Sequence, residues 1–378
     1  MTFKNFFFNT EGATRSRMPW IDYTKGIAII LVIYRHVWFG LTRDKLDTFH
    51  YLYLKHANDI VYSFRMPLFF ILSGIFVGKS LAKRTRKQFI VNKFDTLLYP
   101  YLIWAFIQVT LQILFTRFTN SHRGPMAYLD IIIQPRVLDQ LWYLISLFDV
   151  TLLYMVFKSV FRVNTRWQLL LGLVFYYLAT LVQNYSLFHD AFYYYFFYAV
   201  GDNISLFVLK PGQEKKFSSF YLLAVLLPLF AFTQLFFINH PLDFKSDQLQ
   251  QYVTASSLGF YFLFVIITLI GCAFLTNISF ILQRLRILKW FRVVGYHSLY
   301  IYVIHLSLIF LFRIVMTRIF GVTNVPVLLF GSILIGVVLS IMIYNFLLRM
   351  GGWFLFTWDP SKKKMTIFRP QGEVSPES

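Results

Sequence analysis

The stretch PWIDYTKGIAIILVIYRHVW, residues 19–38, carries four ionisable side chains inside an otherwise apolar run: Asp22, Lys25, Arg35 and His36. A helix over this stretch can form a first membrane span, since about 20 apolar residues cross a bilayer. Ionisable groups inside a span are costly, so they normally face a bundle interior or a water-filled cavity. The stretch is therefore the leading functional candidate.

Helical geometry predicts that three of these side chains share one face. Lys25 and His36 are eleven positions apart, and at roughly 100° per residue they end about 20° from each other. Asp22 lies three residues before Lys25 and joins this face. Lys25 and His36 are separated along the axis by roughly 16 Å, about half a hydrocarbon core. The alternative is that Lys25 and Arg35 reach opposite interfaces while His36 hydrogen-bonds a neighbouring helix.

The composition of the whole chain is typical of a multi-pass membrane protein. Of its 378 residues, 57% are hydrophobic and only 14% are charged. The apolar runs predict an all-α polytopic fold with about ten transmembrane helices, over residues 20–41, 60–78, 95–116, 138–157, 167–183, 191–209, 217–238, 252–276, 294–313 and 326–348. The aromatic run FYYYFFYAVGDN, residues 192–203, is interpreted as part of an interfacial belt.

The distribution of basic residues predicts the topology. With ten spans, the side of the membrane that holds both termini carries 25 of the 36 lysines and arginines. Because cytoplasmic loops carry the excess of Lys and Arg, we expect both termini in the cytoplasm. We expect a cytoplasmic segment over 1–19, one membrane domain over 20–350 and a cytoplasmic tail over 351–378. The net charge of +19 then indicates contact with membrane lipid rather than nucleic acid.

Further candidates lie in the other spans. Arg65 lies near the start of the second span, at the membrane level expected for His36. Asp149 lies deep in the fourth span, where a carboxylate is either protonated or paired with a cation of the first span. Asp202, near the cytoplasmic end of the sixth span, is a weaker candidate of the same kind. His305 lies inside the ninth span, where a single histidine is more often a packing hydrogen-bond donor than a catalyst.

Two basic clusters are expected on the cytoplasmic side. The denser one, KSLAKRTRKQFIVNK over residues 79–93, contains Arg84, Arg86, Lys87 and Lys93. The second contains Arg284, Arg286, Lys289 and Arg292. Such a cluster either holds anionic lipid headgroups or binds the phosphates of coenzyme A or a nucleotide. We expect no metal site, because His50 and His56 lack a recognisable ligand set.

Several of these stretches together resemble the integral membrane acyltransferase family 3, over roughly residues 18–350. In chain order they are TKGIAIILVIYRHV, FRMPLFFILSGIFV, LLYPYLIW, LWYLISLF, FYYYFFYAVGDN and GYHSLYIYVIHLSL. Lys25 and His36 match the family's basic residue and histidine with ten residues between them, with lysine in place of the more familiar arginine. Arg84 with Lys87, or Lys93 with Thr96, only partly matches a family motif of two arginines before the third span.

The resemblance implies transfer of an acyl group, most often acetyl, from acyl-CoA to a hydroxyl of a cell-surface glycan or glycan precursor. The implied setting is the cytoplasmic (inner) membrane of a bacterium, with acyl-CoA as donor substrate and no permanently bound cofactor. His36 is then the general base, and Arg35 or Arg65 stabilises the developing oxyanion. Lys25 and the 79–93 cluster attract the donor phosphates, and Asp149 orients or charge-balances the site.

Two other classes of function fit the same residues. Buried charges also line translocation paths, so a carrier or flippase for a lipid-linked sugar or a small metabolite is the main alternative. A third possibility is an acyltransferase-like sensor or assembly subunit without catalysis. Acyl transfer by purified protein separates the enzyme from both.

Overall fold

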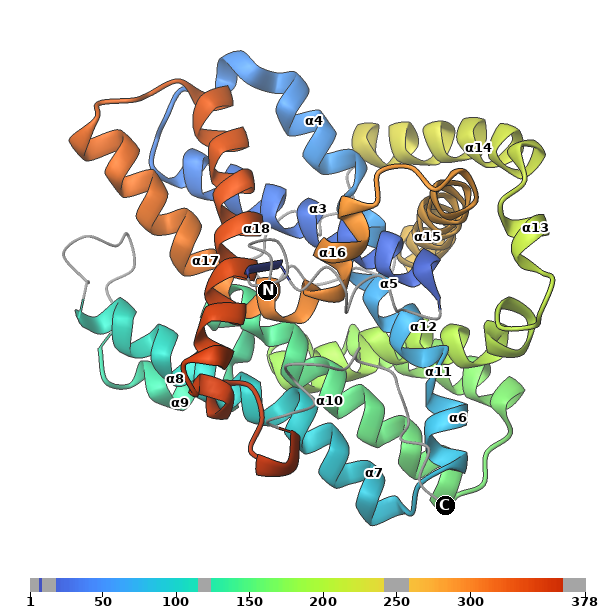
Figure 1. The fold of residues 1–378 in the computed structure, drawn as a ribbon. Coiled ribbons are helices and arrows are strands. Elements are labelled where there is room, and N and C mark those ends of the chain that lie inside the picture. Colours follow the sequence, from blue (N-terminus) through green and yellow to red (C-terminus); the bar gives the residue numbers. More distant parts are fainter. Residues whose placement is uncertain (1–6, 9–17, 115–123, 241–257, 363–378) are drawn as a thin grey trace. The chain divides into compact units, whose positions relative to one another are not determined.

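The computed structural model describes residues 7–8, 18–114, 124–240 and 258–362, and these ranges are helical and contain no strand (Figure 1). Most of the predicted segment 1–19 and the tail beyond residue 362 lie outside the described residues. The longer helices are α3 (Pro19–Arg43), α5 (Tyr62–Gly74), α8 (Tyr99–Leu114), α10 (Trp142–Met155), α11 (Thr165–Ala179), α12 (Ser186–Val208), α14 (Phe220–Asn239), α15 (Leu258–Leu285), α17 (Ser298–Ile314) and α18 (Val325–Arg349).

Shorter helical elements connect them. The short α-helices are α4 (Leu52–Ile60), α6 (Val77–Ala82), α7 (Arg86–Lys93), α9 (Ala127–Ile133), α13 (Glu214–Phe217) and α16 (Trp290–Tyr296). The 3₁₀ elements are η1 (Phe49–Tyr51), η3 (Pro135–Leu141), η7 (Gly352–Leu355) and η8 (Pro360–Lys362). The π-helical elements are η2 (Phe94–Leu98), η4 (Val156–Val160) and η6 (Val315–Ile319).

Eight helical stretches of the described chain are long and apolar enough to cross a membrane. They fall on eight of the ten predicted spans, which confirms an all-α, multi-pass membrane fold. The other two predicted spans are α11, which has 15 residues, and α12, which has 23. Neither is among the eight, because α11 is short and the tyrosines and carboxylates of α12 reduce its hydropathy. A total of ten spans thus stays a prediction.

Helix α3 begins and ends where its sequence favours it. Pro19 occupies the first turn, where its missing N–H costs no hydrogen bond. Asp22 lies in the first turn and Arg43 in the last, so each charge complements the helix dipole. The helix is uninterrupted over 25 residues, and the register argument for Lys25 and His36 therefore applies along its full length.

The chain divides into two compact units. Unit 1 is formed by Met1–Asn58 and Leu282–Ser378, and unit 2 by Asp59–Ile281. Unit 1 therefore joins the two ends of the sequence around α3, and unit 2 holds the middle. Of the candidate residues, Asp22, Lys25, Arg35, His36 and His305 belong to unit 1.

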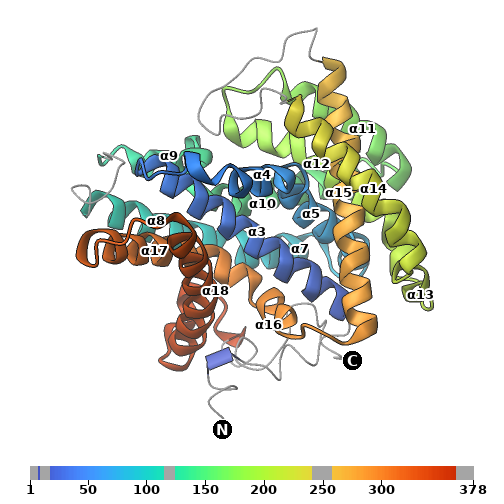
Figure 2. The same ribbon diagram turned by 90° about the horizontal axis from the view of Figure 1, so that it is seen from above.

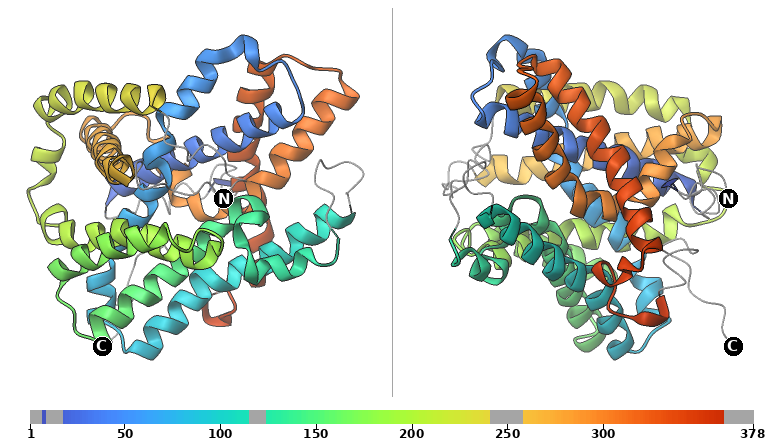
Figure 3. Two further views of the ribbon diagram at one scale, coloured as in Figure 1. Left: turned by 180° about the vertical axis from the view of Figure 1, so that it is seen from behind. Right: turned by 60° about the vertical axis from the view of Figure 1, so that its left-hand side comes forward.

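In unit 1, α3 is crossed near its N-terminal end by α16 (Figure 2). The crossing is close because Gly26 faces the backbone of Phe291 and Gly295 faces the backbone of Asp22. A Cβ atom at either glycine would overlap backbone that cannot move aside, so glycine is required at both positions. Helices α17 and α18, orange and red in Figure 3, pack against each other and against α3.

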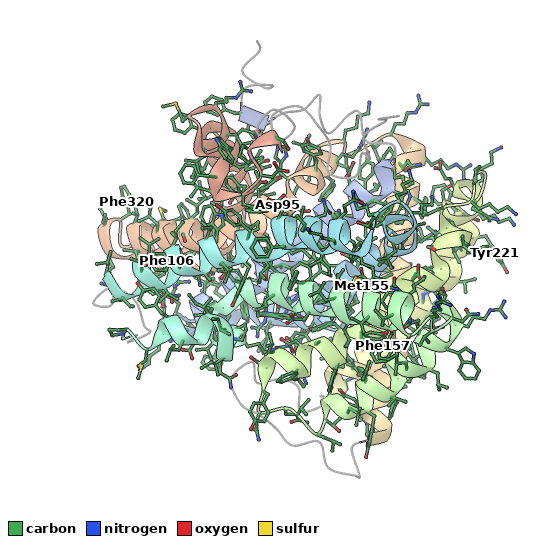
Figure 4. All side chains as sticks on the ribbon, turned by 90° about the horizontal axis from the view of Figure 1, so that it is seen from below. Asp95, Phe106, Met155, Phe157, Tyr221 and Phe320 are labelled. Carbon is green, nitrogen blue, oxygen red and sulfur yellow. The ribbon has the colours of Figure 1, made fainter. Side chains whose placement is uncertain are left out.

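In unit 2, the aromatic run of α12 is core. Tyr195, Phe197 and Tyr198 are 0% exposed, and α12 packs on α5, α10 and α11. The prediction of an interfacial belt here was wrong, because the run pairs with neighbouring helices rather than facing outward. The outer surface of unit 2 carries other apolar side chains. Phe106 on α8 and Tyr221 on α14 project outward and are 57% and 81% exposed (Figure 4), as expected for a surface that contacts lipid.

Candidate active site

Two histidines meet inside unit 1. His36 lies on α3 and is partly buried, while His305 lies on α17 and is 0% exposed. Their ring centroids are 5.5 Å apart and the rings are tilted by 53°. The sequence pointed to each residue separately, and the fold brings them together from positions 269 residues apart in the chain.

The hydrogen bonding of His305 fixes which nitrogen carries the proton in the neutral ring. Its Nδ1 lies 2.9 Å from the carbonyl oxygen of Ile301, one turn earlier. Because a carbonyl oxygen only accepts, Nδ1 donates, and Nε2 is left with the lone pair. Nε2 is buried and has no hydrogen-bond partner within the described residues. An unsatisfied buried acceptor costs about 1–3 kcal/mol, so it marks a functional candidate.

The wall behind His305 is apolar and tightly packed. Gly336 of α18 lets that helix approach, since a Cβ there would lie 2.9 Å from Ile309 Cγ2 and 3.4 Å from Ile33 Cγ2. The same hypothetical atom would be 3.8 Å from His305 Cβ. His305 is therefore held by packing as well as by its backbone hydrogen bond, which limits the positions its ring can adopt.

The other charged side chains of α3 have separate surroundings. The Arg35 guanidinium lies 5.2 Å from the centroid of the Phe39 ring, one turn along the same helix. Asp22 and Lys25 interact electrostatically across one turn, and Asp22 is 8% exposed. Helix α3 thus carries an acid–base pair near its start and the histidine in its second half, as the spacing predicted.

The remaining candidates belong to unit 2. Asp149, in α10, has a buried Oδ2 without a hydrogen-bond partner among the described residues, and it interacts electrostatically with Asp190. Arg65, in α5, is 4% exposed, and its guanidinium lies 5.3 Å from the Tyr62 ring centroid. The roles predicted for Asp149 and Arg65 stay predictions.

Three of the six cations of the 79–93 cluster contact other groups of the protein. Arg84 Nη1 donates to Ser80 Oγ at 2.7 Å, and Arg86 Nη2 donates to the Ser159 carbonyl at 2.5 Å. Lys93 Nζ lies 5.6 Å from the Phe89 ring centroid, while Lys87 is exposed. These contacts order the segment. A capping box at the start of α7 stabilises it further.

Two ionic clusters in unit 2 were missed or underrated by the sequence analysis. Asp202 accepts a 2.6 Å hydrogen bond from Tyr154 and pairs with Lys158, which also donates to Thr165 at 3.0 Å. The sequence analysis did not single out Lys158, because nothing local in the sequence indicates its pairing with a residue 44 positions away.

The second ionic cluster lies where η3 leads into α10. The Arg136 guanidinium bonds both carboxylate oxygens of Asp190 at 2.7–2.8 Å and lies 4.3 Å from the Trp142 ring centroid. His189 Nδ1 is 3.0 Å from Asp190 Oδ1. Because the Arg136 guanidinium covers one face of Trp142 and Tyr194 stacks with that ring, we regard this cluster as a structural connection between η3 and α12.

These features define a multi-pass helical membrane protein in which a partly buried and a fully buried histidine lie side by side. The family described as an acyltransferase domain, acyltransferase family 3, matches residues 18–345. This match covers most of the chain, so the chain belongs to that family, and the resemblance noted in the sequence is confirmed. The chain is therefore a multi-pass membrane member of the acyltransferase family.

One curated relative is similar over part of the chain. It is nodulation protein NolL of Mesorhizobium japonicum, 31% identical over 99 residues, which are 26% of this chain and 26% of the relative. The match thus spans about a quarter of that protein's length. No solved structure matches the chain.

Proposed function

We propose that the protein transfers an acyl group, most often acetyl, from acyl-CoA to a hydroxyl of a cell-surface glycan or glycan precursor, in the cytoplasmic (inner) membrane of a bacterium. The observation that supports it is the His36–His305 pair. The buried imidazole of His305 has an acceptor nitrogen without a partner within the described residues, and it lies next to the partly buried imidazole of His36. A hydroxyl is a poor nucleophile at neutral pH, so its transfer chemistry needs such a base.

In the proposed reaction, a ring nitrogen of His36 takes the proton of the acceptor hydroxyl. The hydroxyl oxygen attacks the thioester carbonyl carbon, the carbon–sulfur bond breaks, and the coenzyme A thiolate leaves. His36 then returns its proton to that sulfur. The products are an ester and free coenzyme A, and His36 is restored.

His305 acts as a positioning residue for this base. Its Nε2 lone pair accepts a hydrogen bond from an N–H of the His36 ring, which the centroid distance of 5.5 Å permits once the His36 side chain turns. That bond orients His36 and stabilises the imidazolium formed when it takes the proton. Arg35 stabilises the developing oxyanion, and Lys25 attracts the donor phosphates.

The test is acyl transfer by purified protein in lipid nanodiscs, with radiolabelled acetyl-CoA and a glycan acceptor. His36→Ala is expected to lower kcat about 10²- to 10⁴-fold, the usual contribution of a general base. The matched control is His56→Ala, which removes an exposed histidine of α4 and should leave the rate unchanged. Transfer undiminished in His36→Ala would refute the assigned base.

A wild-type protein that carries an acceptor across proteoliposome membranes without acylating it would refute the enzyme and support the carrier. The acceptor and the acyl group are identified together by mass spectrometry of cell-surface glycans with and without the gene. A mass increment lost with the gene identifies both.

A further inference from the structure

A compact basic patch lies beside the start of α3 in unit 1. Four cations, Arg284, Arg286, Lys289 and Arg292, fall within nine residues that include no acidic side chain. The first three are exposed and Arg292 is partly exposed. We call these four residues and Trp290 the α16 patch.

The α16 patch is attached to the helix that carries His36. The side-chain oxygen of Gln283 accepts a 2.7 Å hydrogen bond from the backbone N–H of Trp20. The hydroxyl of Tyr23 donates to the Ile287 carbonyl oxygen at 2.7 Å. Together with the Gly26–Phe291 contact, these bonds hold the patch beside the first two turns of α3, where Lys25 lies.

The backbone between α15 and α16 is held in an unusual conformation. Arg286 and Leu288 have φ values of 57° and 50°, a left-handed region that side chains other than glycine seldom adopt. Such conformations persist where surrounding contacts impose them, and they cluster at functional sites. Here the contacts are those of Gln283 and Ile287 with α3.

An exposed aromatic ring accompanies the charges. Trp290 is 51% exposed and stacks on Phe291 with ring centroids 3.8 Å apart. Phe291 covers one face of the indole, so the other can receive a flat ring. Aromatic side chains bind nucleic acid bases in this way, and arginine and lysine bind phosphate groups.

We propose that the α16 patch binds the nucleotide end of the acyl donor, with Arg286, Lys289 and Arg292 on its phosphates and Trp290 on its adenine. This rests on the proposed function, and it assigns the donor to unit 1 instead of to the 79–93 cluster of unit 2. Lys25 and His36 lie roughly 16 Å apart along α3. The pantetheine arm of coenzyme A has a comparable reach, so a nucleotide at the patch places the thioester near His36.

The experiment measures binding of coenzyme A to the purified full chain in nanodiscs of phosphatidylcholine, which contain no anionic lipid. Arg286→Gln with Lys289→Gln should weaken coenzyme A binding at least about tenfold. Lys215→Gln with Lys216→Gln, which removes the same charge from exposed lysines of α13, is the matched control and should leave the affinity unchanged. Size-exclusion profiles verify that each variant is folded.

Trp290→Ala separates adenine recognition from phosphate attraction. It should weaken binding of coenzyme A about tenfold and leave binding of 4′-phosphopantetheine, which lacks the adenine, unchanged. Equal losses for both ligands would contradict the stacking role.

Three results would overturn the proposal. The proposal is refuted if Arg286→Gln with Lys289→Gln leaves the coenzyme A affinity unchanged. It is also refuted if Arg84→Gln with Lys87→Gln lowers that affinity instead. A patch variant that loses only binding to phosphatidylglycerol vesicles assigns the patch to lipid headgroups. In each of these cases, acyl transfer by the wild type and its loss in His36→Ala would still support the proposed function. A wild-type protein that does not bind coenzyme A would refute both the donor site and the proposed function.

Discussion

Asp202 in unit 2 and His305 in unit 1 are both ionisable and almost fully buried, yet their polar atoms have opposite surroundings. The Oδ2 atom of Asp202 accepts hydrogen bonds from Tyr154 and Thr165 and pairs with Lys158. His305 has one satisfied nitrogen and one buried nitrogen without a partner within the described residues. Satisfied buried groups specify structure, whereas an unsatisfied one costs stability and is kept where a function requires it. The comparison thus predicts which residue affects folding and which affects turnover.

The largest effect is expected from Asp202→Ala. Asp202→Ala removes the shared acceptor of Tyr154, Thr165 and Lys158, and each buried donor left unsatisfied costs about 1–3 kcal/mol. Thermal unfolding in detergent should show a clearly lower Tm, and the kcat of the remaining folded fraction should be close to wild type. A normal Tm together with a lost kcat would contradict the structural role of Asp202 and assign it to the reaction.

An intermediate effect is expected from His305→Asn. Asparagine can still donate to the Ile301 carbonyl but lacks the atom at the Nε2 position. We expect kcat to fall about 10- to 100-fold, which corresponds to roughly 1.4–2.8 kcal/mol, with the KM for the donor and the Tm nearly unchanged.

The control is His305→Gln, whose side-chain oxygen can reach the Nε2 position and should restore part of the rate. Equal kcat in the two variants, or a fall in Tm that accounts for the loss, would show that His305 only fills space.

The smallest effect is expected from Lys158→Met. The Lys158 side chain is 23% exposed, and Asp202 keeps its two hydroxyl donors when the cation is removed. The cost should be about 1 kcal/mol, within the range of partly exposed pairs. A double-mutant cycle with Asp202→Ala measures the coupling. A coupling energy near zero would show that the two hydroxyls alone satisfy the carboxylate.

The first span was predictable because its determinants are local. Pro19, Asp22 and Arg43 define the ends of a helix whose expected range of 20–41 became Pro19–Arg43. The Lys25–His36 register follows from helix geometry alone. Local hydropathy likewise located eight of the predicted spans.

What the sequence could not supply is which helices face each other. The tyrosines of α12 have the composition of an interfacial belt, but their partners on α5, α10 and α11 make them core. The pairing of Lys158 with Asp202 and of His36 with His305 depends on the same long-range packing. Local patterns in a single sequence do not predict contacts between segments that are distant in the chain.

Because the chain has a single cysteine, it is suited to labelling at cysteines introduced by mutation. Cys272 is 5% exposed, and its thiol lies 3.7 Å from the Phe64 carbonyl oxygen, so a membrane-impermeant maleimide should not reach it in the folded protein. Cysteines introduced one at a time, at exposed positions such as Lys289 and His56, can then be labelled from either side of sealed vesicles. The labelling pattern would give the orientation of the termini without removing any native residue of the membrane core.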